Sequence, residues 1–152
     1  MKKITPLIFE TYLAIINNSL KSKSFSNFYA KVNGKKVDVL RNGDLSCAFF
    51  LSSVLILFKF ISKVHTTIKS TLEDLEKSGW KKISKPKIGS VLVWEKIKFP
   101  NGESNRHIGF YIGNNKAVST NHKLGYPVKH HWKFNGKRKI ENILWNSAIV
   151  EK

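Results

Sequence analysis

The chain has 152 residues, with 27 lysine and arginine residues against 10 acidic residues, so its formal charge is +17. This length suits a single domain over residues 1–152, and 41% hydrophobic and 12% aromatic residues exclude a disordered chain. The one cysteine excludes an internal disulfide, so nothing in the sequence requires an oxidising compartment.

The first predicted element is a helix over residues 6–20, where apolar side chains recur at roughly helical spacing. Polar residues interrupt this stretch and no small-residue cleavage site follows it, which indicates an amphipathic helix and not a signal peptide. We therefore expect a cytoplasmic protein, with delivery to the cell envelope by other means as the alternative.

The second predicted element is the most apolar helix of the chain, from Cys47 to Ile61. It follows the turn and capping residues of segment 42–46, so Cys47 is expected at the helix start. Spanning a bilayer takes roughly twenty apolar residues, so we expect a buried central helix and no transmembrane segment. Unpaired N–H groups and the helix dipole favour a thiolate at this position. The alternative is that Cys47 is a small buried packing residue.

A third helix is predicted over residues 71–79, beginning at a capping box and ending at Gly79. The second half of the chain is predicted to form strands over residues 88–94, 107–112 and 116–121, with edge strands around Trp132 and over residues 143–150. Helices followed by antiparallel strands predict an α+β fold with the Cys47 helix packed against the sheet.

His107 opens the second of these strands, on a different element from Cys47. A lone thiol at a helix start and a histidine on a strand is the layout of an enzyme with a cysteine nucleophile and a histidine base. On the following strand, Ser119 and Asn121 share a face, and either side chain is a candidate to orient the imidazole. A bulge in the hairpin would bring Thr120 or His122 there instead.

Four segments carry a family resemblance in their order and spacing: 44–47 (DLSC), 87–94 (KIGSVLVW), 107–113 (HIGFYIG) and 114–119 (NNKAVS). Together they resemble the NlpC/P60 cysteine peptidases over roughly residues 40–121. The resemblance implies a papain-like core with Cys47 as nucleophile, His107 as base and a polar third group on the next strand. It also implies cleavage of an amide bond in bacterial cell-wall peptide, so that peptidoglycan fragments are the expected substrates.

We further expect Trp94, Tyr111 and Trp132 to contact the substrate, because amphipathic side chains often rim a cleft. The histidines at positions 122, 130 and 131 lack a recognisable zinc spacing, so neither a metal nor another cofactor is expected. A monomer is expected.

Two alternatives come from other classes of protein. The charge of +17 and the aromatic residues among the lysines are compatible with a domain that binds nucleic acid or another anionic polymer. The second alternative keeps the papain-like fold as a degenerate scaffold without catalysis.

Overall fold

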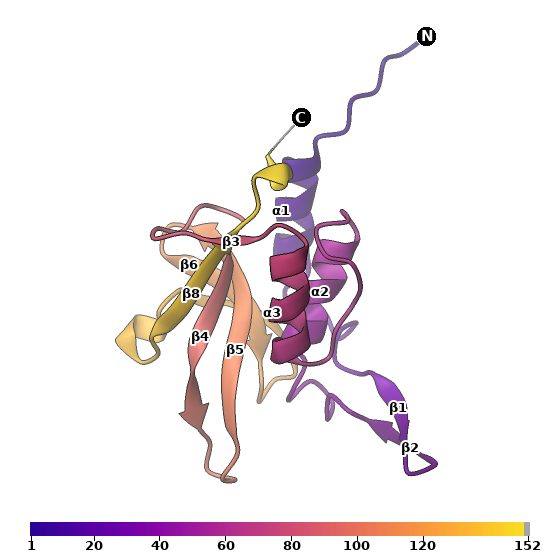
Figure 1. Cartoon of the computed structure of the whole chain (residues 1–152), viewed down its shortest axis with the longest axis vertical. Helices are drawn as coiled ribbons and strands as arrows, with labels where there is room; N and C mark the ends of the chain where they lie inside the picture. Colours follow the sequence, from indigo (N-terminus) through magenta and orange to yellow (C-terminus); the bar gives the residue numbers. More distant parts are fainter. Residues whose placement is uncertain (151–152) are drawn as a thin grey trace.

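The computed structural model describes residues 1–150, in which three α-helices cover one face of a six-stranded antiparallel sheet (Figure 1). The helices are α1 (Ile8–Asn18), α2 (Cys47–Ile56) and α3 (Ile68–Lys77). In sheet order the strands are β3 (Lys81–Lys82), β8 (Ile140–Trp145), β4 (Val91–Lys98), β5 (Ser104–Gly113), β6 (Lys116–Asn121) and β7 (Tyr126–His131). The predicted α+β class is therefore confirmed.

The sheet is apolar on both faces, because side chains alternate along each strand. The face toward the helices carries six buried apolar residues: Val91, Val93, Ile108, Phe110, Val118 and Leu144. They pack with α2, whose six buried residues are Ala48, Phe50, Leu51, Ser52, Val54 and Leu55. The opposite face carries a smaller cluster of Leu92, Trp94, Tyr111 and Ala117. Each large apolar side chain buried in this way contributes about 1.5–3 kcal/mol to folding.

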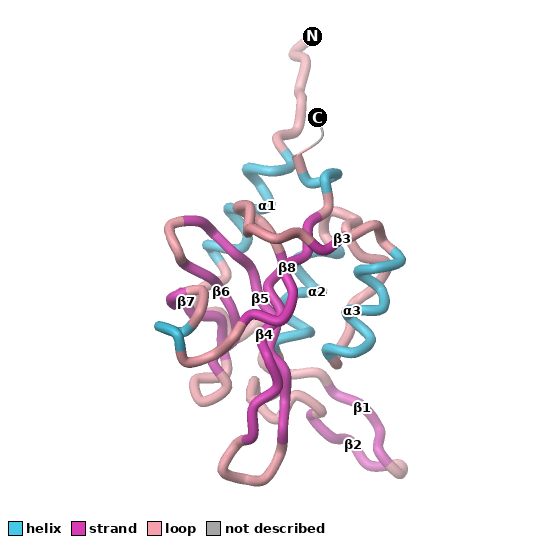
Figure 2. Tube along the Cα trace, turned by 60° about the vertical axis from the view of Figure 1, so that its left-hand side comes forward, coloured by secondary structure: helices cyan, strands magenta, loops and turns pink. Residues whose placement is uncertain are grey.

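A β-hairpin precedes α2, in a segment where the sequence predicted no strands. Strands β1 (Tyr29–Val32) and β2 (Lys35–Asp38) pair around an Asn33-Gly34 turn, in which both residues have positive φ. Asn-Gly is the preferred pair for such a two-residue turn. Figures 1 and 2 show this hairpin projecting from the body of the protein, away from the six-stranded sheet.

Several predicted boundaries differ from the structure, among them the end of the central helix, which is Ile56 and not Ile61. The third helix begins at Ile68, where Thr67 is the N-cap and accepts the backbone N–H of Ser70, so the predicted capping box at Thr71 lies inside the helix. The C-terminal strand β8 lies between β3 and β4 and is not an edge strand. Gly79, with φ of +95°, follows the helix end as predicted.

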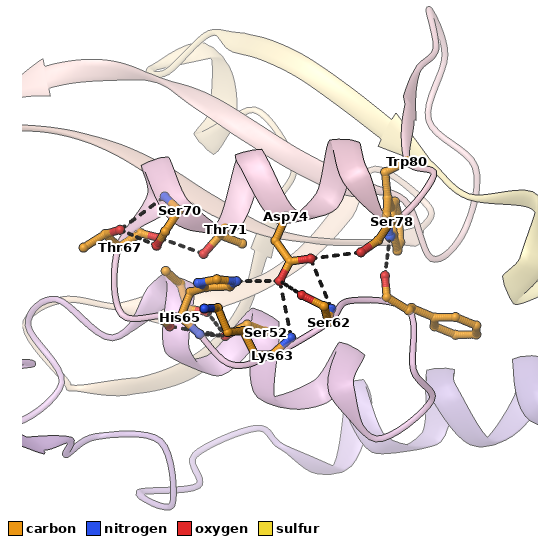
Figure 3. A network of polar contacts seen from close by, with 12 residues as sticks. Ser52, Ser62, Lys63, His65, Thr67, Ser70, Thr71, Asp74, Ser78 and Trp80 are labelled. Carbon is orange, nitrogen blue, oxygen red and sulfur yellow. Dashed lines mark hydrogen bonds and ion pairs between the residues drawn. The ribbon is translucent and has the colours of Figure 1, made fainter.

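A buried polar network joins α3 to the loop after α2 (Figure 3). The Asp74 carboxylate accepts the Ser62 hydroxyl at 2.7 Å and the Ser78 hydroxyl at 2.9 Å, and it lies 2.6 Å from His65 Nε2. The backbone N–H of His65 also donates to the Ser52 hydroxyl of α2 at 2.9 Å. This network fixes the loop just before residues 66–68, which form one wall of the pocket described next.

Among residues 1–150, no helix combines the length and the apolar character needed to cross a membrane.

Candidate active site

A pocket of about 620 Å³ contains both candidate catalytic side chains. Cys47 is the first residue of α2 and is partly exposed, and His107 lies half-buried on β5. The remaining walls come from the loop before α2, residues 66–68, the β4–β5 hairpin, the end of β6 and the loop before β8. The structure therefore brings the two predicted residues to one cavity from separate elements.

The loop before α2 is held against the β6–β7 turn by a close backbone approach. A Cβ on Gly43 would lie 2.2 Å from the Gly125 carbonyl oxygen, so no larger residue fits there. The Ser26 hydroxyl donates to the same Gly125 carbonyl at 2.6 Å. Ser46, the N-cap of α2, donates to the Gly43 carbonyl at 2.9 Å and makes no side-chain cap to the helix. Cys47 is thus fixed relative to the strand that follows the histidine strand.

His107 belongs to a chain of hydrogen bonds through two further side chains. Its Nε2 lies 2.9 Å from Ser119 Oγ, and Ser119 Oγ lies 2.6 Å from His130 Nε2. The Nδ1 of His130 lies 2.8 Å from the backbone carbonyl of His131. Phe134 stacks on the His130 ring with centroids 4.2 Å apart. The chain runs from β5 through β6 to β7.

The last acceptor of this chain, the His131 carbonyl, determines which ring nitrogens carry protons. A carbonyl can only accept, so His130 Nδ1 carries a proton, and in the neutral ring His130 Nε2 accepts the Ser119 hydroxyl. Ser119 Oγ then accepts N–H from His107 Nε2, which leaves His107 Nδ1 without a proton. Burial lowers the pKa of both histidines, consistent with neutral rings at pH 7. The imidazole of His107 is therefore held with Nδ1 unprotonated.

The surroundings of Cys47 favour the neutral thiol over the thiolate. Burial raises the pKa of Cys47 to about 11, although the backbone N–H groups of Ile108 and Ala48 and the charge of Arg138 favour the thiolate. Burial is also the main cause that lowers the pKa of His107, and the positive charge of Arg138 lowers it further. The thiolate expected from the helix start is corrected to a neutral pair of thiol and imidazole, because desolvation outweighs the helix terminus.

Close packing of β5 on β6 puts Ser119 within reach of His107. A Cβ on Gly109 would lie 2.7 Å from Ser119 Cβ, 2.7 Å from the Val118 carbonyl oxygen and 3.1 Å from the Trp94 ring. Because Gly109 has no side chain, His107 can reach diagonally from β5 past Gly109 to Ser119 on β6.

A Gly109→Ala substitution is therefore expected to separate β5 from β6 at the site and to lower the free energy of unfolding by about 1–3 kcal/mol. Urea denaturation measures this change. Ser104→Ala, at an exposed position of the same strand, is the control. If Gly109→Ala were no more destabilising than Ser104→Ala, the close approach would have no energetic role.

The other candidates for the third group lie elsewhere. Asn121 lines the pocket, but its Oδ1 accepts the backbone N–H groups of Lys123 and Leu124, each at 3.0 Å. His122 is exposed and pairs with Asp44 at 3.5 Å. Thr120 Oγ1 is buried without a hydrogen-bond partner among the described residues. Of the four candidates, only Ser119 is hydrogen-bonded to His107 within residues 1–150.

The three aromatic residues expected to contact substrate lie outside this pocket. Trp94 is fully buried, and its ring lies 5.2 Å from the His107 ring while its Nε1–H donates to the Trp132 carbonyl at 2.8 Å. Tyr111 is 9% exposed and packs edge-on against Trp132. The structure thus places Trp94 behind the histidine, as support for its ring.

His130 is the member of the site that the sequence analysis missed. It was considered with His122 and His131 as a metal ligand, but no group of three His, Cys, Asp or Glu side chains within residues 1–150 is arranged to hold a metal ion. On β7, His130 pairs with Ala117 and therefore lies on the same face as Ser119. The pairing of β7 with β6 is the feature that would have identified His130 as a member of the site.

No model of a known protein family matches the sequence, and no curated protein matches it.

Proposed function

We propose that this protein is a cysteine hydrolase that cleaves an amide bond. The observation that carries the proposal is the shared pocket of Cys47 and His107, with His107 oriented through Ser119 and His130. A nucleophile, a base and a group that orients the base are the three parts that such a site needs. The buried hydrogen-bond chain also favours this function over a role in packing alone.

The proposal includes a papain-like fold of the NlpC/P60 type, acting on bacterial cell-wall peptide. A cysteine at the start of a buried helix and a histidine on the antiparallel sheet packed against it support this assignment, together with the sequence resemblance. Ser119 takes the place of the polar group on the following strand. A cytoplasmic location remains the expectation from the sequence.

In the proposed reaction, His107 Nδ1 takes the thiol proton as Cys47 Sγ attacks the substrate carbonyl carbon. The C–N bond then breaks, the amine leaves with the proton held by His107, and an acyl-enzyme remains. A water molecule next gives a proton to His107 and attacks the thioester, which releases the acid and restores the thiol. A neutral imidazole is the form that this first step requires.

The start of α2 supplies stabilisation for the developing oxyanion. The backbone N–H of Cys47 lies in the first turn, where N–H groups have no partner within the helix. Preorganised backbone donors of this kind typically contribute about 2.7–4 kcal/mol to a transition state. Ser46 leaves the first turn without a side-chain cap.

The pH dependence of iodoacetamide alkylation at Cys47 tests this site. With a thiol pKa raised to about 11, alkylation by the free thiolate is expected to keep rising well above pH 8.5, the ordinary midpoint. Proton transfer to His107 is expected to add a second rise in the alkylation rate near neutral pH. His107→Ala is expected to remove this rise and to leave the increase at alkaline pH unchanged. His122→Ala is the matched control, since this exposed histidine lines the same pocket.

A Cys47 that is alkylated equally slowly at neutral pH with and without His107 contradicts the proposal. That outcome would favour the degenerate scaffold.

A further inference from the structure

A positively charged side chain that the proposed mechanism does not use lines the same pocket. Arg138, in the loop before β8, is half-buried and borders the cavity that contains Cys47 and His107. Its Nε–H donates to the Glu95 carbonyl at 2.9 Å, and its Nη2–H donates to the Asn105 carbonyl at 2.7 Å. These contacts fix the guanidinium between β4 and β5.

The position of Arg138 follows from an irregularity in the sheet. Trp94 pairs with His107, but Ile97 pairs with Asn105, so β4 contains one extra residue between the two pairs. A bulge of this kind leaves carbonyl groups without their strand partners. Arg138 satisfies one carbonyl on each strand, directly beside the pair that includes His107.

The charge of Arg138 is not neutralised by a carboxylate. Within residues 1–150 its guanidinium forms no ion pair, and the Glu95 carboxylate accepts the backbone N–H of Lys139 at 2.8 Å. A guanidinium has five N–H donors, and two are used by the carbonyls. The remaining donors have no hydrogen-bond partner within residues 1–150, and the Glu95 carboxylate attracts the guanidinium without forming an ion pair with it.

The acidic residues of the pocket are already paired. Glu103 forms a two-pronged hydrogen bond with Arg41, at 3.0 and 2.8 Å, and Asp44 lies 3.5 Å from both Arg41 and His122. Lys96 and Arg106 also line the cavity, so its charge is positive on balance. A cavity lined by an excess of positive charge attracts anionic substrates.

We propose that Arg138 is an anion-binding residue of this site and that the preferred acyl donor carries a carboxylate near the scissile amide. The inference rests on the proposed function, because it assigns substrate to the pocket of Cys47. The charge of Arg138 reaches the reacting groups, since it favours the Cys47 thiolate and disfavours the His107 imidazolium. A planar guanidinium binds a carboxylate through two parallel hydrogen bonds.

Two alkylating reagents of nearly the same size test this proposal. Iodoacetate carries a carboxylate, and iodoacetamide carries a neutral amide in its place. The measured quantity is the ratio of their rates at Cys47 in the folded protein, relative to the same ratio in a peptide of residues 42–50. Arg138 is expected to raise the ratio in the protein above that in the peptide by about tenfold, as one charge pair in a partly buried site can do.

Arg138→Gln is expected to remove most of this preference, while Arg138→Lys keeps part of it. Lys137→Gln makes the same change in net charge at an exposed neighbour and is expected to change the ratio by less than about twofold, because exposed charges are screened. Arg106→Gln tests the general field of the pocket. An equal loss in Arg106→Gln and Arg138→Gln overturns the assignment to Arg138.

The outcomes separate this inference from the proposed function. If Cys47 reacts readily with both reagents and the protein shows no more preference for iodoacetate than the peptide does, the anion site is wrong and the hydrolase proposal stands. If neither reagent reacts at neutral pH, the proposed function fails and the anion site fails with it. If Arg138→Gln does not fold, the loss of preference in Arg138→Lys compared with that in Arg106→Gln decides the assignment.

Discussion

Cys47→Ala is expected to lower the rate of peptidoglycan-fragment hydrolysis by at least about 10⁴-fold, because the variant has no atom that can form the acyl-enzyme. The measurement is the release of new amino groups from purified fragments, followed by chromatography and mass spectrometry. Cys47 is partly exposed at the helix start, so its replacement by the smaller alanine leaves the core of α2 in place. The circular dichroism spectrum of the variant is expected to match that of the wild type.

The histidines of the pocket provide the matched comparison for this experiment. His107→Ala is expected to lower the hydrolysis rate by about 10²–10⁴-fold, the usual contribution of a general base. His122→Ala, which lines the same cavity but is exposed and pairs only with Asp44, is expected to stay within a few-fold of wild type. A Cys47→Ala protein that kept its full hydrolytic activity would rule out the mechanism proposed above.

The elements with strong periodicity could be predicted from the sequence. The run from Cys47 is so apolar that only a buried helix could accommodate it, and its start at Cys47 is confirmed. Residues 116–121 form a strand with the predicted bounds. The β1–β2 hairpin escaped prediction because its strands are mostly exposed and lysine-rich, so they show little of the apolar pattern of a half-buried strand.

Pairings between distant segments were harder to predict. The sequence predicts an edge strand over residues 143–150, whereas the observed strand β8 covers Ile140–Trp145. Strand order is set by long-range pairing, and nothing local shows that β8 inserts between β3 and β4. The same limitation hid His130, which meets Ser119 only because β7 pairs with β6. Thr67 was passed over as a helix cap because Thr71 carries a similar local pattern inside the helix.

The identity of the main site residues could be predicted from the sequence, but their protonation states could not. Cys47 and His107 could be chosen from spacing, and strand alternation narrowed the third group to Ser119 or Asn121 without deciding between them, since these are local properties. The pKa of the thiol depends on how completely the surrounding elements exclude water, and no local pattern reports that. Burial reverses the expectation from the helix start and raises the pKa of Cys47 to about 11.

Asp74→Asn is expected to lower the free energy of unfolding by about 3–5 kcal/mol, because it removes one partner of a buried charged network. The Asp74 side chain is 7% exposed and that of His65 is 8% exposed. The carboxylate accepts from Ser62, Lys63 and Ser78 as well as pairing with His65 (Figure 3). In asparagine, an NH₂ group replaces one of the two accepting oxygens. This group would face N–H and O–H groups that are themselves donors, so these hydrogen bonds would be lost.

The matched control is Glu73→Gln on the same helix, which removes an exposed charge and is expected to change stability by less than about 0.5 kcal/mol. Burial opposes ionisation of Asp74, but the hydrogen bonds from His65, Ser62 and Ser78 outweigh it and hold the pKa of the carboxyl well below its usual range. Because the folded pKa lies below the unfolded value of about 3.9, the stabilisation is complete above that pH and is lost as the pH falls below it. The difference in unfolding free energy between wild type and Asp74→Asn should therefore be constant at neutral pH and shrink below about pH 4. A difference that persisted unchanged at lower pH would show that Asp74 acts through packing and not through its charge.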